Sequence, residues 1–438
     1  MREIEDQKQI EKRNYKMEKM KQLREQPDSQ ERYRRWLTLL CTMVYFFSYL
    51  TRYNYSVVLV DIINSEGFTK VDASAALTGM FFTYGLGQLV SGYLGDHVEP
   101  TLLISVGLLS TSILNFLIPF CPTATWMTVV WCLNGFAQAL FWPPMVKFLT
   151  QRLSPKAYQK SVVTTAWGAN LATMLLFLIA PVVIRYSTWK NLFWICGTAS
   201  LVMIVVWNVG VRKADEKGKP QMTPIAKKER SDIWNAITGP IRIVLLVVLL
   251  ANILQGALRD SMTSWFPTFI SEQFHLKSEL SILSGVFVPA LSVLSTMFAG
   301  KVQRKWIHNE ILCAALGFAI AAVCCTVVRT AGSNQILTTV FFAGTIGCSH
   351  AVNLYLGSIL PGRFSKKNCV STISGALNCA IYIGSAISMY VIARITQAKG
   401  WLATLNIWII AALIGMLLCL SLARIWKCFL KENDEQNE

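Results

Sequence analysis

Twelve long apolar segments follow one another along this chain, and each is long enough to cross a membrane as a helix. A hydrocarbon core of about 30 Å needs about 20 residues at a rise of 1.5 Å per residue. Charged residues make up only 15% of the chain, too few to give so much apolar sequence a soluble surface. The sequence excludes an ordinary soluble enzyme and predicts an all-α membrane protein with twelve transmembrane helices. The segments are 36–62, 73–95, 101–121, 125–151, 160–185, 190–211, 241–270, 280–300, 309–329, 335–360, 370–395 and 401–427.

One polar and basic interruption divides these spans into two sets of six, which predicts two pseudo-symmetric bundles. The N-terminal residues are dense in charges of both signs and lack the apolar core of a signal peptide. We expect the following organisation: a charged N-terminal arm at 1–35, a six-helix bundle at 36–211, a linker at 212–240, a second six-helix bundle at 241–427 and a tail at 428–438.

Basic residues are concentrated on one side of this predicted topology. Most of the 41 lysines and arginines fall in the arm, the linker, the tail and the loops after spans 4, 8 and 10. Cytoplasmic loops carry such an excess, so we expect an integral protein of the cell (plasma or inner) membrane with both termini in the cytoplasm. The same segments account for the net charge of +16. We therefore expect contact with the lipid bilayer and not with nucleic acid. We also expect a functional monomer.

Two arginines lie deep inside predicted spans, where an uncompensated charge is costly. Arg52 is 16 residues beyond Trp36 and Arg259 is 18 residues beyond Ile241, the first residues of spans 1 and 7. A pseudo-twofold axis between the bundles would bring both arginines to one central cavity. Two guanidinium groups carry a charge of about +2, which suits the charge and geometry of a phosphate monoester. The pair is therefore the candidate phosphate-binding site.

Two structural alternatives stay open for these arginines: each could pair with a local acid or extend to the membrane surface. Span 1 carries no acid until Asp61. Asp260 directly follows Arg259, although adjacent side chains on a helix point about 100° apart. Asp260 could oppose a bound anion or hold Arg259 in place.

Aromatic and polar side chains on the spans are candidates for contacts with the organic part of the substrate. Span 4 contains Trp142-Pro143-Pro144, where the helix must bend or end because proline has no N–H. A histidine on span 10 has the alternative role of packing between helices. The candidates beside the two arginines are Tyr53, Tyr55, Trp142, His350, Asn353 and Tyr382.

The sequence indicates no cofactor and no metal site. Its 12 cysteines have no repeated spacing and no histidine cluster, so we interpret them as small buried hydrophobic residues. Spans 4, 8 and 10 carry no acidic residue, whereas proton-driven carriers usually hold one near the middle of the membrane. This favours the exchange of two anions over proton symport.

Three short sequences resemble motifs of the organophosphate:phosphate antiporter family of the major facilitator superfamily. They are Leu-Thr-Arg-Tyr-Asn-Tyr at 50–55, Trp-Pro-Pro at 142–144, and Leu-Arg at 258–259 followed by Trp-Phe-Pro-Thr at 265–268. The resemblance implies two halves that rock about the midplane while exchanging a phosphorylated metabolite for inorganic phosphate. It also implies that Arg52 and Arg259 bind the substrate phosphate.

Three positions depart from that family's pattern. Gln88 stands where a lysine is often found, Ala169-Asn170 replaces a His-Asn pair of the glycerol 3-phosphate carriers, and Asp260 replaces an aromatic residue. The first two changes remove positive or titratable groups, and the departures favour a sugar phosphate over glycerol 3-phosphate. Two other functions stay open: a membrane sensor of hexose phosphate that signals to a partner kinase, and a proton-coupled organic-anion symporter.

Overall fold

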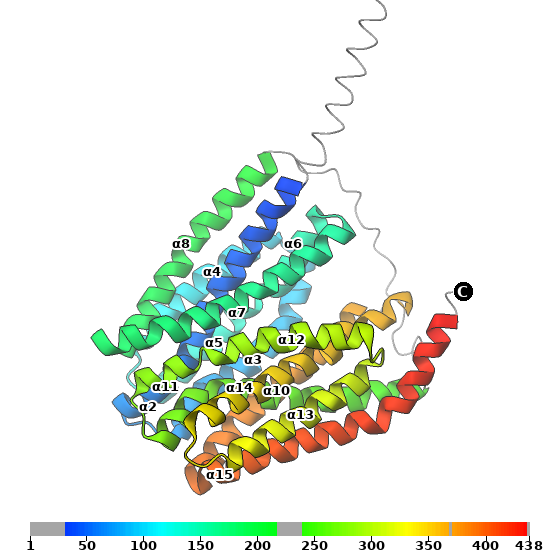
Figure 1. Cartoon of the computed structure of the whole chain (residues 1–438). Helices are drawn as coiled ribbons and strands as arrows, with labels where there is room; N and C mark the ends of the chain where they lie inside the picture. The colour runs from blue at the N-terminus through cyan, green and yellow to red at the C-terminus, as the bar shows by residue number, and fades with distance from the viewer. Residues whose placement is uncertain (1–30, 217–238, 368–369, 436–438) are drawn as a thin grey trace, which may run out of the picture.

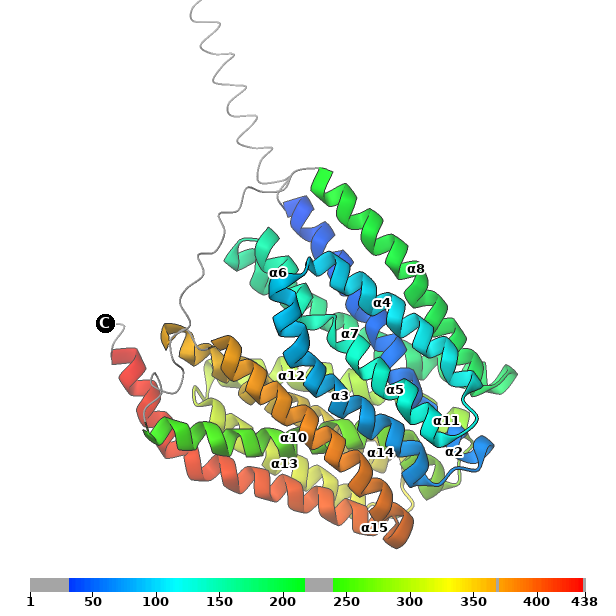
Figure 2. The same cartoon turned by 180° about the vertical axis from the view of Figure 1, so that it is seen from behind.

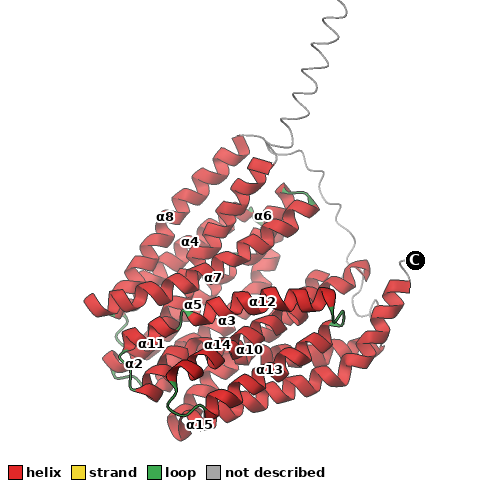
Figure 3. Cartoon of the chain, viewed as in Figure 1, coloured by secondary structure: helices red, strands yellow, loops and turns green. Residues whose placement is uncertain are grey.

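The structure, a computed structural model, describes residues 31–216, 239–367 and 370–435, and these are almost entirely helical (Figures 1 and 3). No strand occurs among them. The predicted all-α fold is therefore confirmed. Most of the predicted arm and linker and the last residues of the tail lie outside the described residues.

Helices cover the six predicted spans of the first half. Span 1 is a helix over 31–57 that continues, after a turn, as α2 (Leu59–Glu66). Span 4 is also in two pieces: α5 (Ala124–Ala139) ends just before α6 (Trp142–Arg152), whose first turn contains two prolines. Proline is tolerated there but not in a helix interior, so the predicted break is confirmed. The others are α3 (Lys70–His97), α4 (Pro100–Leu117), the 3₁₀ turn η1 (Ile118–Phe120), α7 (Pro155–Tyr186) and α8 (Trp189–Glu216).

The six predicted spans of the second half are helical as well. α15 (Val370–Glu435) contains two of these spans, which meet at Gly400. Gly400 is not helical, since its φ is 74° and its ψ is −178°, a conformation that suits glycine. Span 10 changes its winding: α14 (Gln335–Asn353) runs into a π-helical turn, η2 (Leu354–Ile359). The others are the 3₁₀ segment η3 (Leu360–Lys367), α10 (Gly239–Phe274), α11 (Ser278–Ser284), α12 (Phe287–Lys305) and α13 (Glu310–Thr330).

The outer surface of these helices is apolar. By length and composition, eight helices of the described chain can cross a membrane, and the long α15 is one of them. Large hydrophobic side chains that a soluble protein would cover lie on the surface, such as Leu89, Val205 and Phe298. So much exposed apolar surface requires lipid around it. The protein is therefore an integral membrane protein.

The helices gather in two groups that follow the order of the sequence (Figures 1 and 2). α3 to α8 lie together, α10 to α15 lie together, and α3 packs against α15 at the junction between the groups. The described chain begins and ends at the same end of the array (Figure 1), as an even number of crossings requires. The predicted bundle boundaries, 36–211 and 241–427, agree with this grouping and stay predictions.

Polar contacts join the two groups at the end opposite to the chain termini. Lys70 of α3 donates a hydrogen bond of 2.6 Å to Glu272 of α10, and Trp401 Nε1 of α15 donates to the same carboxylate oxygen over 2.8 Å. Deeper in the junction, the hydroxyl oxygens of Ser56 and Ser264 lie 3.2 Å apart. The two halves are thus held together at this end.

Two glycines allow α10 and α15 to approach closely. A Cβ atom at Gly256 would collide with the carbonyl oxygen of Ile381, and one at Gly384 would collide with the carbonyl oxygen of Ile253. A backbone carbonyl cannot move aside as a flexible side chain does. At Gly375, also on α15, nothing lies within 4 Å of such an atom. Close helix packing therefore explains Gly384 but not Gly375.

We expect Gly384→Ala to lower the melting temperature of the detergent-purified protein, because the added methyl group forces two backbones apart. Overpacking of this kind costs about 1–3 kcal/mol. Gly375→Ala is the matched control on the same helix, where alanine meets open space and gains about 0.5–1 kcal/mol over glycine. Equal melting temperatures for the two variants would contradict the close packing of α10 on α15.

Candidate functional site

Arg52 is a buried cation surrounded by aromatic rings. Only 2% of its surface is exposed, and the centroids of five rings lie 3.9–5.9 Å from its guanidinium carbon. Its Nε has no hydrogen-bond partner, and no ion pair between described residues includes it. The arginine is therefore stabilised by ring faces, and its buried Nε–H is left without a partner. The rings of this aromatic cage are Tyr49, Tyr53, Phe81, Tyr84 and Tyr382.

Both halves of the protein contribute to the aromatic cage. Tyr49 and Tyr53 lie one helical turn apart on the helix over 31–57, and their rings stack with centroids 5.3 Å apart. Tyr84 comes from α3 and Tyr382 from α15, and these two rings meet edge to face at 4.5 Å. The cage therefore spans the junction between the halves, and any movement of one half relative to the other must change it.

A buried polar network holds the helical turn that carries Arg52. The side-chain amides of Asn115 and Asn134 each donate to the carbonyl oxygen of Thr51 over 3.1 Å. Gln138 donates to the Thr51 hydroxyl over 3.0 Å. All four residues are buried, where unpaired polar groups would be costly. Asn134 and Gln138 thus position the arginine helix from α5.

Arg259 has a different environment, because it forms an ion pair with its sequence neighbour. Its Nε and one terminal nitrogen each donate to an oxygen of Asp260 over 2.8 Å. The hydroxyl of Ser385 on α15 donates to the same carboxylate over 2.6 Å. Although adjacent side chains leave the helix about 100° apart, the long arginine side chain reaches its neighbour. Of the structural alternatives for Arg259, the structure shows the local ion pair.

The two arginines nevertheless belong to one electrostatic cluster. Tyr53 and Tyr382 each interact electrostatically with both guanidinium groups. Asp260 interacts in the same way with Arg52 as well as with Arg259. The structure therefore brings the two predicted arginines together at the junction between the halves, with one of them already paired.

The remaining sequence candidates occupy different places. His350 of α14 interacts electrostatically with the ion pair of α10, and Asn353 is half-buried at the last residue of α14, where the π-helical turn begins. The ring of Trp142 lies 5.0 Å from that of Tyr45, which in turn lies 5.0 Å from Tyr49 of the aromatic cage. His350 and Trp142 thus lie close to the cluster, and Asn353 follows His350 by three residues on α14.

Tyr55 is the predicted candidate that the structure does not bring to the cluster. Its hydroxyl donates to the carbonyl oxygen of Ala73 over 3.1 Å. Its ring packs 5.2 Å from that of Trp131, inside the first group of helices. Tyr55 follows Arg52 by less than one helical turn, but it leaves the helix on a different face.

Sequence reasoning missed four residues of the cluster. Tyr49 lies three residues before Arg52, a spacing that places it near the arginine, but Tyr55 has the same spacing on the other side. Tyr84 lies four residues, about one helical turn, before Gln88, which was already noted as a departure from the family's pattern. Phe81 and Ser385 give no signal in a single sequence, because their positions depend on how distant helices pack.

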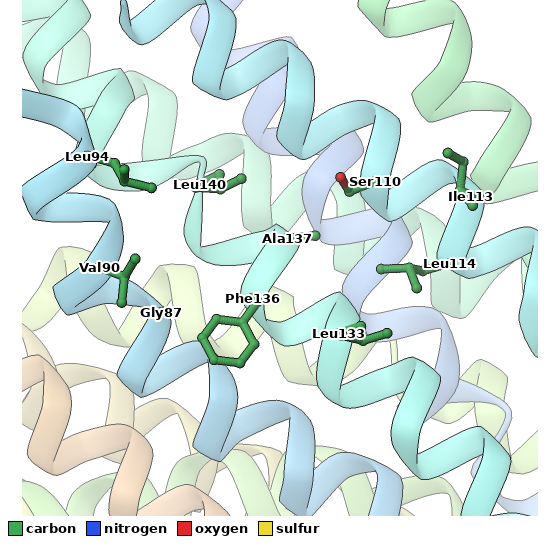
Figure 4. Close-up of a pocket in the computed structure, with 10 residues that line it drawn as sticks. All are labelled: Gly87, Val90, Leu94, Ser110, Ile113, Leu114, Leu133, Phe136, Ala137 and Leu140. Atoms are coloured by element: carbon green, nitrogen blue, oxygen red, sulfur yellow. The ribbon is translucent and has the colours of Figure 1, made fainter. Parts of the chain in front are cut away.

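The apolar cavity in Figure 4 is a separate feature. It has a volume of about 490 Å³ and lies between α3, α4 and α5. The residues that line it include Ser110, Leu133 and Phe136, and none is charged. An anion has no partner there, because a buried charge needs a counter-charge or hydrogen bonds. Among the residues that the structure describes, no three His, Cys, Asp or Glu side chains gather as metal ligands do.

We expect Tyr84 and Arg52 to be energetically coupled, because the guanidinium carbon lies 3.9 Å from the ring centroid. Tyr84→Leu should lower the free energy of unfolding, whereas Tyr84→Phe should retain most of it because the ring face remains. In a double-mutant cycle with Arg52→Gln, the coupling should be about 0.5–2 kcal/mol. Equal losses with and without the arginine, measured by thermal unfolding, would mean that the ring only fills space.

Known proteins are similar to this chain in sequence and in fold. The Major Facilitator Superfamily model matches residues 41–389. A probable hexose phosphate transport protein of Chlamydia pneumoniae is 23% identical over 92% of this chain and 94% of its own. The membrane sensor protein UhpC of Salmonella typhimurium is 20% identical over 90% of this chain and 92% of its own.

A solved structure supports the same fold. A bacterial homologue of the human lysosomal transporter Spinster, in an inward-facing and unoccupied conformation, matches with a TM-score of 0.69 and 13% identity. The match covers 90% of this chain and 96% of that one. Since the superfamily model spans most of the sequence, and the structure has the corresponding helices, the chain belongs to the Major Facilitator Superfamily.

Proposed function

We propose that this protein is a membrane transporter that exchanges a phosphorylated organic metabolite, with sugar phosphates as the favoured class, for inorganic phosphate. The observation that carries the proposal is Arg52, a buried cation with an unpartnered Nε inside a cage built by both halves. A desolvated charge without a counter-ion is costly. A bound phosphate group removes that cost through charge-assisted hydrogen bonds. Binding of an oxyanion therefore follows from the chemistry of the site.

Exchange follows from the same energetics. We propose that the bundles at 36–211 and 241–427 rock about the site. Without a bound anion, the site could change from one side of the membrane to the other only by closing around an unpaired guanidinium. Inorganic phosphate and an organophosphate both neutralise that charge, and either can therefore accompany the return step. The cargo crosses chemically unchanged, so the proposal assigns no enzymatic activity. It also assumes a monomer in the cell membrane with both termini in the cytoplasm.

The similarity to the hexose phosphate transport protein supports a sugar as the organic part. Sugar hydroxyl groups need hydrogen-bond partners, and sugar rings pack on aromatic faces. We propose that such a group is held on the side of the aromatic cage that faces Trp142, and on α14 near His350 and Asn353. Tyr53 and Tyr382 would contact both the phosphate and the organic part.

Two other functions each have one observation in their favour. The similarity to UhpC favours a sensor, in which the charged arm would contact a signalling partner. The buried carboxylate of Asp260, beside the site on span 7, favours a proton-coupled symporter, because a titratable group near the midplane is what such carriers use.

Counterflow in proteoliposomes distinguishes these functions. Vesicles loaded with phosphate should take up labelled glucose 6-phosphate, and vesicles without internal phosphate should not. Collapsing the proton gradient should leave this uptake unchanged. Binding without any counterflow would favour the sensor, and uptake that disappears with the proton gradient would favour the symporter. Either result would overturn the exchange proposal.

We expect Arg52→Lys and Arg259→Lys each to reduce counterflow by about ten-fold or more. At position 52 lysine keeps the charge but loses the planar fork that matches a phosphate, and at position 259 it loses the bidentate pairing with Asp260. Arg185→Lys is the control, because Arg185 is exposed at the end of α7. Uptake rates at several phosphate concentrations provide the measurement. Full activity in both site variants would show that the fork is not needed.

A further inference from the structure

Asp260 brings a negative charge into the candidate site. Only 1% of its surface is exposed. Both of its oxygens accept hydrogen bonds of 2.8 Å from Arg259, and one also accepts from Ser385 over 2.6 Å. A bidentate pair of this geometry cancels the charge of Arg259. The positive charge that remains in the cluster is that of Arg52.

The other groups that face Asp260 do not change the net charge of the cluster. Besides the two arginines, its electrostatic neighbours are Tyr53 from the first helix and His350 from α14. Ser385 from α15 is a neutral donor. With the phenol and the imidazole uncharged, the cluster carries one net positive charge, where the sequence alone suggested about two.

The pair is built to persist when a substrate binds. Arg259 and Asp260 are adjacent on α10, so their separation is limited by the chain itself. A substrate that drew the arginine away would leave a carboxylate buried with only Ser385 as a partner, and removal of one partner of a buried pair is strongly unfavourable. Arg52 has an Nε without a partner, so a phosphate can bind to it without breaking an existing ion pair.

We infer that Asp260 restricts this site to substrates that carry a single negative charge. The inference rests on the proposed function, because it names the charge state of the cargo of the same site. A phosphate monoester loses its second proton near pH 6, so it would be loaded as the monoanion. A phosphate diester would meet the same requirement. A dianion would bring an uncompensated charge close to a buried carboxylate, where repulsion is weakly screened.

Two anions of fixed charge test the inference at pH 7: dimethyl phosphate, with one negative charge, and sulfate, with two. Isothermal titration of the detergent-purified protein should show that dimethyl phosphate binds at least about ten-fold more tightly than sulfate, which corresponds to about 1.4 kcal/mol. Asp260→Asn raises the net charge of the cluster to about +2. It should improve sulfate binding by about ten-fold or more and reduce or reverse the preference.

The double variant Arg259→Gln/Asp260→Asn separates charge from structure. It returns the net charge to about +1, so the preference for dimethyl phosphate should reappear even if both anions bind more weakly. A merely structural role for Asp260 predicts no such return. Asp215→Asn is the matched control, because Asp215 pairs with Arg152 over 3.4 Å outside the cluster. The Asp215→Asn variant should prefer dimethyl phosphate over sulfate to the same degree as the unmodified protein.

Equal binding of the two anions by the unmodified protein would overturn the inference, and so would an unchanged preference in folded Asp260→Asn. If that variant does not fold, the binding preferences of the unmodified protein and of the double variant still test the inference. Titration requires no transport, so a retained charge preference without phosphate counterflow would overturn the exchange proposal alone. Counterflow with no charge preference would overturn this inference alone.

Discussion

A desolvated guanidinium without a counter-ion is the constraint on which the rest of this structure depends. Arg52 is 2% exposed and is stabilised by the faces of five aromatic rings rather than by a carboxylate. Ring faces offset only part of the cost of burying a charge. A buried network around Thr51 fixes the turn that carries it. The helix turn at Thr51 is thus fixed by hydrogen bonds, while the guanidinium of Arg52 has no counter-ion from the protein.

The two halves carry an arginine in corresponding predicted spans, with different chemistry. In the predicted topology spans 1 and 7 are equivalent helices, yet only Arg259 has an adjacent acid. The ion pair with Asp260 makes the second arginine a neutral, preorganised donor group. Fold symmetry therefore predicts where the arginines lie, and local sequence decides how much charge each contributes.

Hydropathy was sufficient to predict the helical spans, because a membrane core imposes both helix length and apolar composition. The break at Trp142 was also predictable, since proline acts through its own backbone. The π-helical turn at Leu354 was not, because it depends on packing. Nor could periodicity distinguish Tyr55, which faces Trp131, from Tyr49, which faces Arg52. Both lie within one turn of the arginine, and only the packing of other helices decides which face is the site.

The most direct measurement is a crystal structure of the protein grown with arsenate, whose arsenic is located by anomalous scattering. We expect an arsenate bound by the guanidinium of Arg52 within the aromatic cage, at nitrogen–oxygen distances of about 2.7–2.9 Å. Asp260 should still be paired with Arg259. An arsenate bound elsewhere, or a guanidinium of Arg52 paired with a protein carboxylate and no anion beside it, would show that Arg52 is not the anion-binding group.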